Sequence, residues 1–523
     1  PFPVVGVATE EPQLRVTFGE GLPGVDEVHT PKSIEERPVD VPMDVILGKA
    51  PRMERDVKRL DGVAEQLDLT VIPLTEAMHR VLRHPTVANK TFLISIGDRS
   101  VGGLCSRDQM VGPWQVPVAD CAVTLADFEG VRGEAMSMGE RSPSAMIDAA
   151  ASGRMAVAEA LTNLVASDVR DLKDVKLSAN WMAACGVDGQ DAALFDTVQA
   201  VSQWCQSLGL SIPVGKDSLS MRTSWEQDGE SRQVISPVSL VVTAFAQVAD
   251  VRRTLTPQLQ TKAGDTALIL IDLGQGKQRM GASVLAHAFN QVGQSVPDMQ
   301  DAQAMLSFVK VIRQLADQDL ILAYHDRSDG GLAATVAEMA FAGHTGVSVN
   351  LDMLTIDPHA ADWGDYKIRA EQVAVQRDEL TLRALFNEEA GAVIQVPLAQ
   401  RDRVMQTLRE AGLSAHSHVI GGLNKNDQIE FYRDGACIYQ APRVELAQQW
   451  SEVSRRIMER RDNPACAQAE FERWQDVEDP GISPRVLFNP QEDIAAPFIA
   501  TGKRPRVAIL REQGCNSQVE MAW

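Results

Sequence analysis

Apolar runs separated by glycine, proline and charged residues divide the chain into candidate strands and helices. The run Thr91–Gly97 and the longer run Val238–Val248 are rich in aliphatic residues, and both predict buried strands. Between them, an alanine- and methionine-rich stretch that reaches about Ala166 predicts a helix. Ser142 is its expected N-cap and Pro143 its first helical residue, where a missing N–H costs nothing.

A second set of alternating strands and helices is expected from Ala263 onward. The apolar run Ala267–Ile271 predicts a strand that leads into the glycine-bearing segment Asp272–Lys277. The alternation continues to about residue 423. A polar and charged stretch at 355–380 interrupts it and predicts a surface insertion.

The two ends of the chain have a different character. Residues 1–47, with short apolar pieces such as Leu14–Phe18, predict a strand followed by a linker. Because the sequence starts without methionine and in strand-like residues, we expect it to begin within a domain. Residues 424–503 predict a connector that is helical around 444–475, and Arg506–Leu510 predicts the first parallel strand of a further α/β domain.

At 523 residues the chain is too long for one hydrophobic core, so several domains are expected. The prediction is a multidomain protein of mixed α/β and α+β structure. Its expected segments are 1–47, 48–250, 258–423, 424–503 and 504–523.

Composition excludes several classes of protein. With 44% hydrophobic and 23% charged residues, the chain resembles an ordinary globular protein. No run approaches the roughly 18 uncharged apolar residues of a membrane span, and the N-terminal residues do not resemble a signal peptide. A net charge of −21 argues against nucleic-acid binding, since phosphate contacts need clustered lysine and arginine.

Cysteine usage indicates the compartment. The seven cysteines are scattered, odd in number and never spaced as C-x-x-C, which is typical of reduced thiols rather than of disulfides or a zinc site. We therefore expect a cytoplasmic protein. The cysteines are Cys105, Cys121, Cys185, Cys205, Cys437, Cys466 and Cys515.

Two patterns offer acidic or amide oxygens as ligands. Asp108 and Asp120 bracket a loop rich in glycine and proline. Glu159 and Asn163 lie four residues apart on the predicted helix, so their side chains share one face.

Two further patterns lie in the second half of the chain. The polar loop His325–Gly331 follows the apolar run Leu320–Ala323, and the glycine loop Gly274–Gly281 would let backbone N–H groups approach phosphates. Carboxylate and amide oxygens suit a hard cation, and Mg²⁺ bridging nucleotide phosphates is the usual case.

Each pattern also has a purely structural interpretation. The pair on the helix could be a solvated face or a cap, and the aspartate-rich loop could be a turn that caps the next helix. The glycine loop lacks the G-x-x-x-x-G-K-S/T spacing of a P-loop, which leaves a generic turn as the alternative. The spacing of these residues does not place the four patterns in one site.

Six segments, in the same order, resemble the second half of the synthetase region of phosphoribosylformylglycinamidine synthase (formylglycinamide ribonucleotide amidotransferase) of the large single-chain type. In addition, Arg511-Glu-Gln-Gly514 resembles the opening of the class I glutaminase domain of that family. The six segments are Lys90–Leu93, Arg107–Cys121, Gly133–Arg141, Leu177–Met182, Pro213–Ser218 and His325–Gly331.

The resemblance implies a fold. The family's synthetase region is a duplicated aminoimidazole ribonucleotide synthetase fold, and each copy has a sheet domain and a C-terminal α+β domain. This chain would hold the tail of the first copy, the second copy at about 58–250 and 258–423, and a truncated, flavodoxin-like start of a class I glutamine amidotransferase domain.

The resemblance also implies a reaction. The family converts formylglycinamide ribonucleotide (FGAR), ATP and glutamine into formylglycinamidine ribonucleotide, ADP, phosphate and glutamate, a step of purine biosynthesis. The second copy is expected to hold an auxiliary nucleotide, ATP or ADP, with Mg²⁺, while turnover occurs mainly in the first copy. The partners implied are the missing first synthetase repeat and the glutaminase domain, with no nucleic acid and no membrane.

Site residues follow from the resemblance position by position. Four residues match magnesium ligands and three match nucleotide contacts. The magnesium ligands are Asp120, Glu159, Asn163 and Asp326, and the nucleotide contacts are Lys90, Ala119 and Ser328.

The chain departs from the family in its catalytic residues. The glutaminase nucleophile and its partners would lie beyond Trp523, so no catalytic residue is expected within the chain. Cys515 matches a strand–helix turn instead, and His325 is expected to order its loop rather than act as a base. Two alternatives remain: an inactive, nucleotide-bound scaffold, or a relative of the same fold that phosphorylates thiamine monophosphate or makes selenophosphate. The segment Arg506–Asn516 argues against the second.

Overall fold

The computed structural model describes residues 6–16, 38–49, 54, 56–60, 65–97, 99, 101–356, 370–515 and 517–522. The chain forms two compact units that divide between Val57 and Lys58. In the first unit, strand β1 (Gln13–Val16) pairs antiparallel with β2 (Val39–Pro42), and a short helix α1 (Met43–Leu47) follows. The strand expected near Leu14 is therefore present, while Phe18 and most of the expected linker lie outside the described residues.

The second unit contains a six-stranded sheet in the order β3-β4-β5-β10-β6-β7. All neighbours pair antiparallel except β6 and β7, which are parallel. The strands are β3 (Cys105–Arg107), β4 (Ala122–Leu125), β5 (Gly133–Glu140), β10 (Ser239–Val248), β6 (Lys176–Met182) and β7 (Ser211–Ser218). The strand expected at Val238–Val248 is thus confirmed as the central β10. A separate hairpin joins β8 (Arg222–Gln227) to β9 (Glu230–Ile235).

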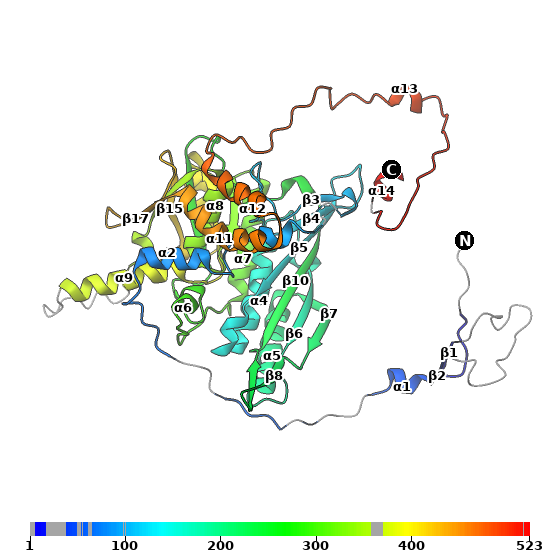
Figure 1. The fold of residues 1–523 in the computed structure, drawn as a ribbon, viewed down its shortest axis with the longest axis horizontal. Coiled ribbons are helices and arrows are strands. Elements are labelled where there is room, and N and C mark those ends of the chain that lie inside the picture. The colour runs from blue at the N-terminus through cyan, green and yellow to red at the C-terminus, as the bar shows by residue number, and fades with distance from the viewer. Residues whose placement is uncertain are drawn as a thin grey trace, which may run out of the picture. The chain divides into compact units, whose positions relative to one another are not determined.

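Helix α4 (Ala149–Leu164) lies against β5 and β10 and packs on α5 (Gln190–Leu208), as Figure 1 shows. Its small residues allow a close approach to the sheet. A Cβ added at Gly139 of β5 would lie 2.1 Å from the backbone oxygen of Ala156, so only glycine fits there. The close approach fixes the height of α4 above the sheet, and with it the position of Glu159.

The start of this helix differs from the prediction. Ser142 and Pro143 belong to a separate 3₁₀ turn (Ser142–Met146), and α4 begins after it. Asp148 is the N-cap, because its side chain accepts a hydrogen bond from the backbone N–H of Ala151 at 2.9 Å. The hydroxyl of Ser142 instead donates to Glu140 at 2.9 Å. The N-cap therefore lies six residues after the expected position, and the side chain of Ser142 bonds locally to Glu140 instead of capping the helix.

A seven-stranded sheet follows, in the order β12-β14-β11-β15-β13-β16-β17. Its pairs are antiparallel except for β13 and β16. The strands are β12 (Ala323–Asp326), β14 (Gly391–Pro397), β11 (Thr266–Asp272), β15 (Ser417–Asn424), β13 (Gly346–Asn350), β16 (Gln428–Arg433) and β17 (Ala436–Pro442).

Both faces of this sheet are buried at β11, the strand expected at Ala267–Ile271. Ile269 and Ile271 belong to the hydrophobic cluster that includes helix α7 (Ala302–Asp317), whereas Leu268 and Leu270 belong to the cluster that includes α8 (Gly331–Gly343). Alternate side chains of a strand point to opposite faces. A continuous apolar run is therefore what a strand covered on both sides requires.

The remaining helices pack mainly around α8. Helix α11 contacts both α8 and α2, α2 contacts α6, and α9 contacts α8. Their bounds are α2 (Leu74–Arg83), α6 (Val284–Ala288), α9 (Ala370–Phe386), α10 (Arg401–Glu410), α11 (Arg443–Arg461) and α12 (Pro464–Glu472). Residues 357–369 of the expected surface insertion lie outside the described part of the chain.

The strand expected at Thr91–Gly97 is wrong: residues Thr91–Ile94 form the short helix α3. The backbone N–H of Thr91 donates to the side chain of Asn89 at 2.7 Å, and that of Phe92 donates to the hydroxyl of Ser454 at 2.8 Å. These side-chain acceptors replace the neighbouring strand that a ladder would need. Leu93 and Ile96 are more than half exposed, so the apolar run is not a core run.

Two expectations for the C-terminal part are also corrected. Residues 428–442 were assigned to a helical connector, but they form β16 and β17 and complete the seven-stranded sheet; the helices follow at α11 and α12. Arg506–Leu510 forms no strand, and among the described residues no strand pairs with it. In the described residues, a 3₁₀ turn (Arg473–Gln475) and the short helices α13 (Ala496–Ile499) and α14 (Gln518–Ala522) follow α12.

Two further features of the structure concern disulfide bonds and membrane-spanning helices. None of the seven cysteines, all within the described residues, forms a disulfide. Within the described ranges, no helix has both the length and the apolar character that crossing a bilayer demands.

Candidate functional site

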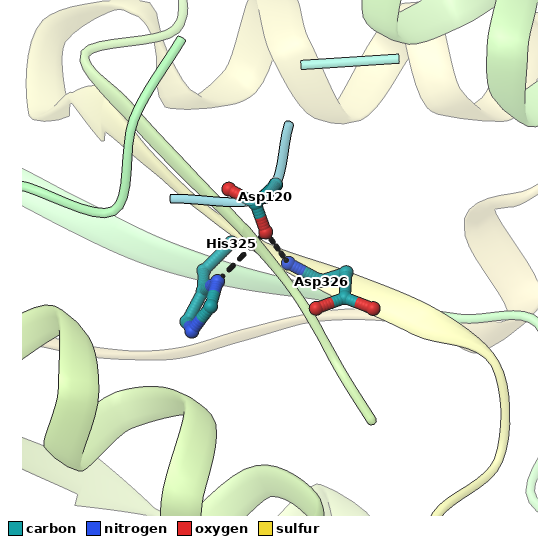
Figure 2. A group of neighbouring side chains, drawn as sticks. All are labelled: Asp120, His325 and Asp326. Carbon is teal, nitrogen blue, oxygen red and sulfur yellow. Dashed lines mark hydrogen bonds and ion pairs between the residues drawn. The ribbon is translucent and has the colours of Figure 1, made fainter. Parts of the chain in front are cut away.

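Asp120 and Asp326 lie side by side although one precedes a strand of the six-stranded sheet and the other ends a strand of the seven-stranded sheet. Asp120 ends the loop before β4, and Asp326 is the last residue of β12. The backbone N–H of Asp326 donates to Oδ1 of Asp120 at 3.1 Å, as Figure 2 shows. Within the described residues, possible metal-ligating atoms of Asp120, His325 and Asp326 all lie within 4.8 Å of one another.

His325 lies between two carboxylates. Its Nδ1 is 2.8 Å from Oδ1 of Asp120, and its Nε2 is 2.9 Å from Oε2 of Glu338 on α8. Burial lowers the pKa of His325, but the charges of Asp120 and Glu338 raise it by more than burial lowers it. The net result is a pKa well above the ordinary value of histidine. The raised pKa favours the doubly protonated ring, in which each nitrogen can donate to one of the two carboxylates. This geometry fits the expectation that His325 orders its loop, because both nitrogens are occupied by protein partners.

The two aspartates carry more negative charge than their protein partners neutralise. Oδ2 of Asp120 is buried and has no hydrogen-bond partner among the described residues. Burial and the neighbouring Asp120 raise the pKa of Asp326 to about 7. A carboxylate in such a position gains a great deal of stability from a bound cation.

Glu159 lies on α4, close enough to act on this pair. Burial raises the pKa of Glu159 well above its ordinary value, with contributions from Asp329 and Asp326 and opposition from Arg141. Its Oε2 accepts a hydrogen bond from the backbone N–H of Glu140 at 2.8 Å. Glu159 itself stands outside the group of atoms within 4.8 Å.

Asn163, one turn further along α4, has its amide anchored to the neighbouring sheet. Its Nδ2 donates to the backbone oxygen of Met138 at 3.1 Å, which leaves Oδ1 as the atom that could bind a ligand. Between the two, the hydroxyl of Thr162 is 3.4 Å from Oδ2 of Asp326. This face of α4 is thus directed at the end of β12.

Lys90, Ala119 and Ser328 occupy the segments around this cluster. Nζ of Lys90 donates to the backbone oxygens of Thr86 (3.0 Å) and Ala88 (2.5 Å). Burial lowers the pKa of Lys90, and the charges of Glu338 and Asp329 oppose the change. Lys90 therefore lies in the field of the acidic cluster, and no described residue forms an ion pair with it at contact distance.

Ala119 and Ser328 are placed by backbone hydrogen bonds. Ala119 donates to the backbone oxygen of Gln109 at 3.2 Å, which closes the loop that Asp120 ends. Ser328 accepts from the backbone N–H of Gly331 at 3.0 Å. Gly331 has φ +66°, and a Cβ there would lie 2.6 Å from the backbone oxygen of Asn387, so the turn into α8 requires glycine.

Sequence reasoning missed the charged residues that organise the cluster. Arg141 is buried, and its guanidinium contacts Asp329 and also Glu388, at 3.4 Å from the latter. Burial lowers the pKa of Arg141, but the surrounding carboxylates, led by Glu159, raise it well above its ordinary value. Arg141 lies in one of the family-like segments, and that was the available signal.

Glu388 connects several loops. Its Oε1 accepts from the backbone N–H groups of Val284 and Gly330, both at 2.9 Å. Burial, together with Asp329, raises its pKa to about 7 against the effect of Arg141. The signal in the sequence was a pair of acids, Glu388 and Glu389, inside an apolar stretch.

The glycine loop 274–281 is not part of this cluster. Asp272 accepts from the backbone N–H of Gly274 at 3.0 Å and from that of Gly276 at 2.7 Å. Those N–H groups are therefore occupied by the protein's own carboxylate. These contacts favour the alternative interpretation of the loop as a turn.

Two family models match the chain. Residues 89–247 match the model described as the FGAR-AT PurM_N-like domain, and residues 262–434 match the model for the C-terminal domain of AIR synthase related protein. The first range holds the six-stranded sheet, and the second holds most of the seven-stranded sheet. Together they cover more than half of the chain.

Several solved structures are similar to it. Thermotoga maritima PurL complexed with FGAR is 12% identical, with 72% of this chain and 54% of that chain covered and a TM-score of 0.49. The same protein complexed with ATP is 11% identical, with 63% and 46% covered and a TM-score of 0.42. Hydrogenase maturation protein HypE in complex with ATP is 15% identical, with 61% and 89% covered and a TM-score of 0.41. The chain spans about half the length of the PurL chains it matches.

The paired sheet domains, one after the other, define an AIR synthase related protein. Within that class, the chain belongs to the synthetase region of the PurL-type FGAR amidotransferases.

Proposed function

We propose that this chain is part of the ATP-dependent ligase that converts FGAR, glutamine and ATP into formylglycinamidine ribonucleotide, glutamate, ADP and phosphate in purine biosynthesis. The observation that carries the proposal is the meeting of Asp120 and Asp326, which brings two acidic motifs from different domains to one point. Two domains that converge on one carboxylate cluster favour a ligand held between them.

We further propose that this half holds Mg²⁺ with ATP or ADP. Asp120, Glu159, Asn163 and Asp326 would be the metal ligands. They fit a hard cation, because Oδ2 of Asp120 is buried and meets no hydrogen-bond partner in the described part of the chain, and because burial and Asp120 raise the pKa of Asp326 to about 7. The cation would supply neutralisation of the nucleotide's phosphate charge.

Lys90, Ala119 and Ser328 would contact the nucleotide. The ammonium group of Lys90 has three N–H donors, and two of them are occupied by backbone oxygens. The third would donate to a phosphate oxygen, and no ion pair with another described residue neutralises the charge of Lys90. Lys90→Gln should weaken nucleotide binding by roughly 10–100-fold, the range of one charge-assisted hydrogen bond.

The site would be auxiliary, and the chain alone would not complete the reaction. Turnover would need the first synthetase repeat and the glutaminase domain. A surface for the first repeat is available on the six-stranded sheet, where Met138, Val214 and Phe245 are at least 40% exposed. The cytoplasm is the proposed compartment.

The test begins with the nucleotide. The purified 523-residue chain, denatured after extensive dialysis, should release about one adenine nucleotide per chain, and the Lys90→Gln variant should release much less. Lys262→Gln, which removes an exposed lysine elsewhere, is the matched control. A well-folded chain that releases no adenine nucleotide would contradict the proposal.

A second assay separates part of an enzyme from an inactive scaffold. The chain should hydrolyse no glutamine, and Cys515→Ser should leave that unchanged. Mixed with the remaining domains and supplied with ammonia in place of glutamine, it should restore formation of formylglycinamidine ribonucleotide. Restoration would support the ligase, whereas nucleotide binding without any restoration would support the scaffold.

A further inference from the structure

A cavity of about 680 Å³ opens beside the glycine loop. Its walls come from the segment before α2 (66–70), from residues 277–281 and 293–295, and from α9 through Glu379 and Arg383. The volume lies within the range of small-molecule binding sites, roughly 300–1,000 Å³. None of the residues assigned above to the cation or the nucleotide lines it.

The backbone around this cavity is held in place from two sides. The N–H of Gly281 donates to the backbone oxygen of Ser295 at 2.7 Å, and the N–H of Asp68 donates to Oε1 of Gln291 at 2.7 Å. Gly293 has φ +93°, and a Cβ there would lie 2.9 Å from Cα of Gly281. Two chain segments therefore touch at glycine and form a fixed wall.

The cationic side chains of this cavity differ in whether a carboxylate pairs with them. The guanidinium of Arg279 is clamped by Glu389, at 2.7 and 2.8 Å, so that charge is already neutralised. Lys277 is exposed, Arg383 is half-buried, and neither side chain has an ion-pair or hydrogen-bond partner among the described residues. A cavity that keeps two cations unpaired suits an anion that binds to both.

Acidic groups at the same cavity restrict the chemical class of ligand that it can bind. Oδ1 of Asp68 accepts from the backbone N–H and the hydroxyl of Thr70, at 3.0 and 2.6 Å. Glu379 lies one helical turn before Arg383, yet the two side chains form no ion pair at 4 Å or less. Glu379 would repel a bare anion but would accept hydrogen bonds from hydroxyl or amine groups of a larger ligand.

We propose that this cavity is a second binding site, for a phosphate monoester that also carries hydroxyl or amine donors, of sugar-phosphate to nucleotide size. Lys277 and Arg383 bind the phosphate, and Glu379 accepts from the polar donors. The site needs no metal ion, because its own cations neutralise the phosphate. It does not depend on the function proposed for the carboxylate cluster.

Calorimetric titration of the 523-residue chain with ribose 5-phosphate tests this, with EDTA present so that no Mg²⁺-nucleotide binds. Saturable one-to-one binding is expected, weakened at least tenfold by Lys277→Gln and by Arg383→Gln and weakened by added salt. Lys310→Gln, which removes an exposed lysine on α7, should leave the affinity unchanged. Ribose without the phosphate should not bind.

Glu379→Gln distinguishes the proposed ligand class from a general anion site. It should tighten binding of inorganic phosphate, because a like charge is removed, and weaken binding of ribose 5-phosphate relative to phosphate. Thermal unfolding of each variant verifies the fold. No saturable binding of ribose 5-phosphate, or binding that both Lys277→Gln and Arg383→Gln leave intact, would overturn the proposal.

Discussion

The backbone N–H of Asp326 donates to the carboxylate of Asp120 at 3.1 Å, across 206 positions of sequence. This hydrogen bond ties the end of β12 to the loop before β4. It also holds two acidic side chains together in a place that water reaches poorly, since Asp326 is 4% exposed. Close carboxylates of this kind repel each other unless a proton or a cation lies between them.

Removal of one carboxylate should therefore have opposite effects with and without a ligand. In EDTA, Asp326→Asn should leave the melting temperature unchanged or raise it, because a buried charge is lost. With Mg²⁺ and ADP in excess, the wild type gains stability from ligand binding, and the variant should lose most of that gain. A hundredfold loss of affinity corresponds to about 2.8 kcal/mol.

Differential scanning fluorimetry measures both states. Asp319→Asn, which changes an aspartate whose side chain is 86% exposed, is the matched control and should follow the wild type in each. An Asp326→Asn variant that keeps the full ligand-induced rise would argue against its role as a metal ligand. In the complete enzyme, an unchanged melting temperature with kcat reduced about a thousandfold would place the chemistry in this half.

The raised pKa of Asp326 predicts a pH dependence of a defined sign. Burial and Asp120 move this pKa from 3.8 to about 7, so between those values the folded state binds more protons than the unfolded state. The free energy of unfolding should then fall as pH rises from about 4 to about 7, by at most about 1.4 kcal/mol per pH unit. Glu388, with a pKa of about 7, contributes in the same direction.

Urea unfolding of the metal-free chain at pH 5, 6, 7 and 8 tests the sign. The difference in unfolding free energy between wild type and Asp326→Asn reports the pH dependence of the Asp326 carboxyl, because titrating groups that the two proteins share contribute to both. The wild type should lose stability relative to the variant up to about pH 7 and change little above it. A difference that stays constant over the range would be incompatible with the raised pKa.

His325 should contribute to stability through its two carboxylate partners. His325→Gln removes a buried positive charge between Asp120 and Glu338 and leaves both acids without it. Breaking a buried pair in this way typically costs about 3–5 kcal/mol. Urea unfolding at pH 7 gives the value, with His79→Gln on α2 as the control. If His325→Gln lowered the free energy of unfolding no more than His79→Gln does, the contacts of His325 with the two carboxylates would not stabilise the fold.

The N-cap of α4 gives a purely structural prediction. Asp148→Ala should cost about 1 kcal/mol, because the N–H of Ala151 loses its acceptor, and Asp148→Asn should cost much less. Ser142→Ala should have the smaller effect of losing one side-chain contact with Glu140. If Ser142→Ala were the more damaging substitution, the cap would lie at the position expected from the sequence.

The residues of the candidate site could be predicted where the signal lies in neighbouring positions of the sequence. Glu159 and Asn163 share a helix face by spacing alone, and Asp326 lies three residues after the apolar run Leu320–Ala323, at the end of β12. Arg141 was not predictable in the same way. Its contact with Glu388 joins residues 247 positions apart, and nothing in the local pattern indicates it.

By itself, the sequence determined the strands that an apolar run or an alternation of apolar and polar residues marks. The alternating and continuous apolar runs at β10 and β11 are local properties, and the strands formed where they predicted. Tertiary structure decided the rest, since it depends on partners that are distant in sequence. Residues 91–94 became a helix because their N–H groups meet Asn89 and, 362 positions away, Ser454. Arg506–Leu510 formed no strand because a strand needs a neighbour for its hydrogen bonds, and the described residues offer it none.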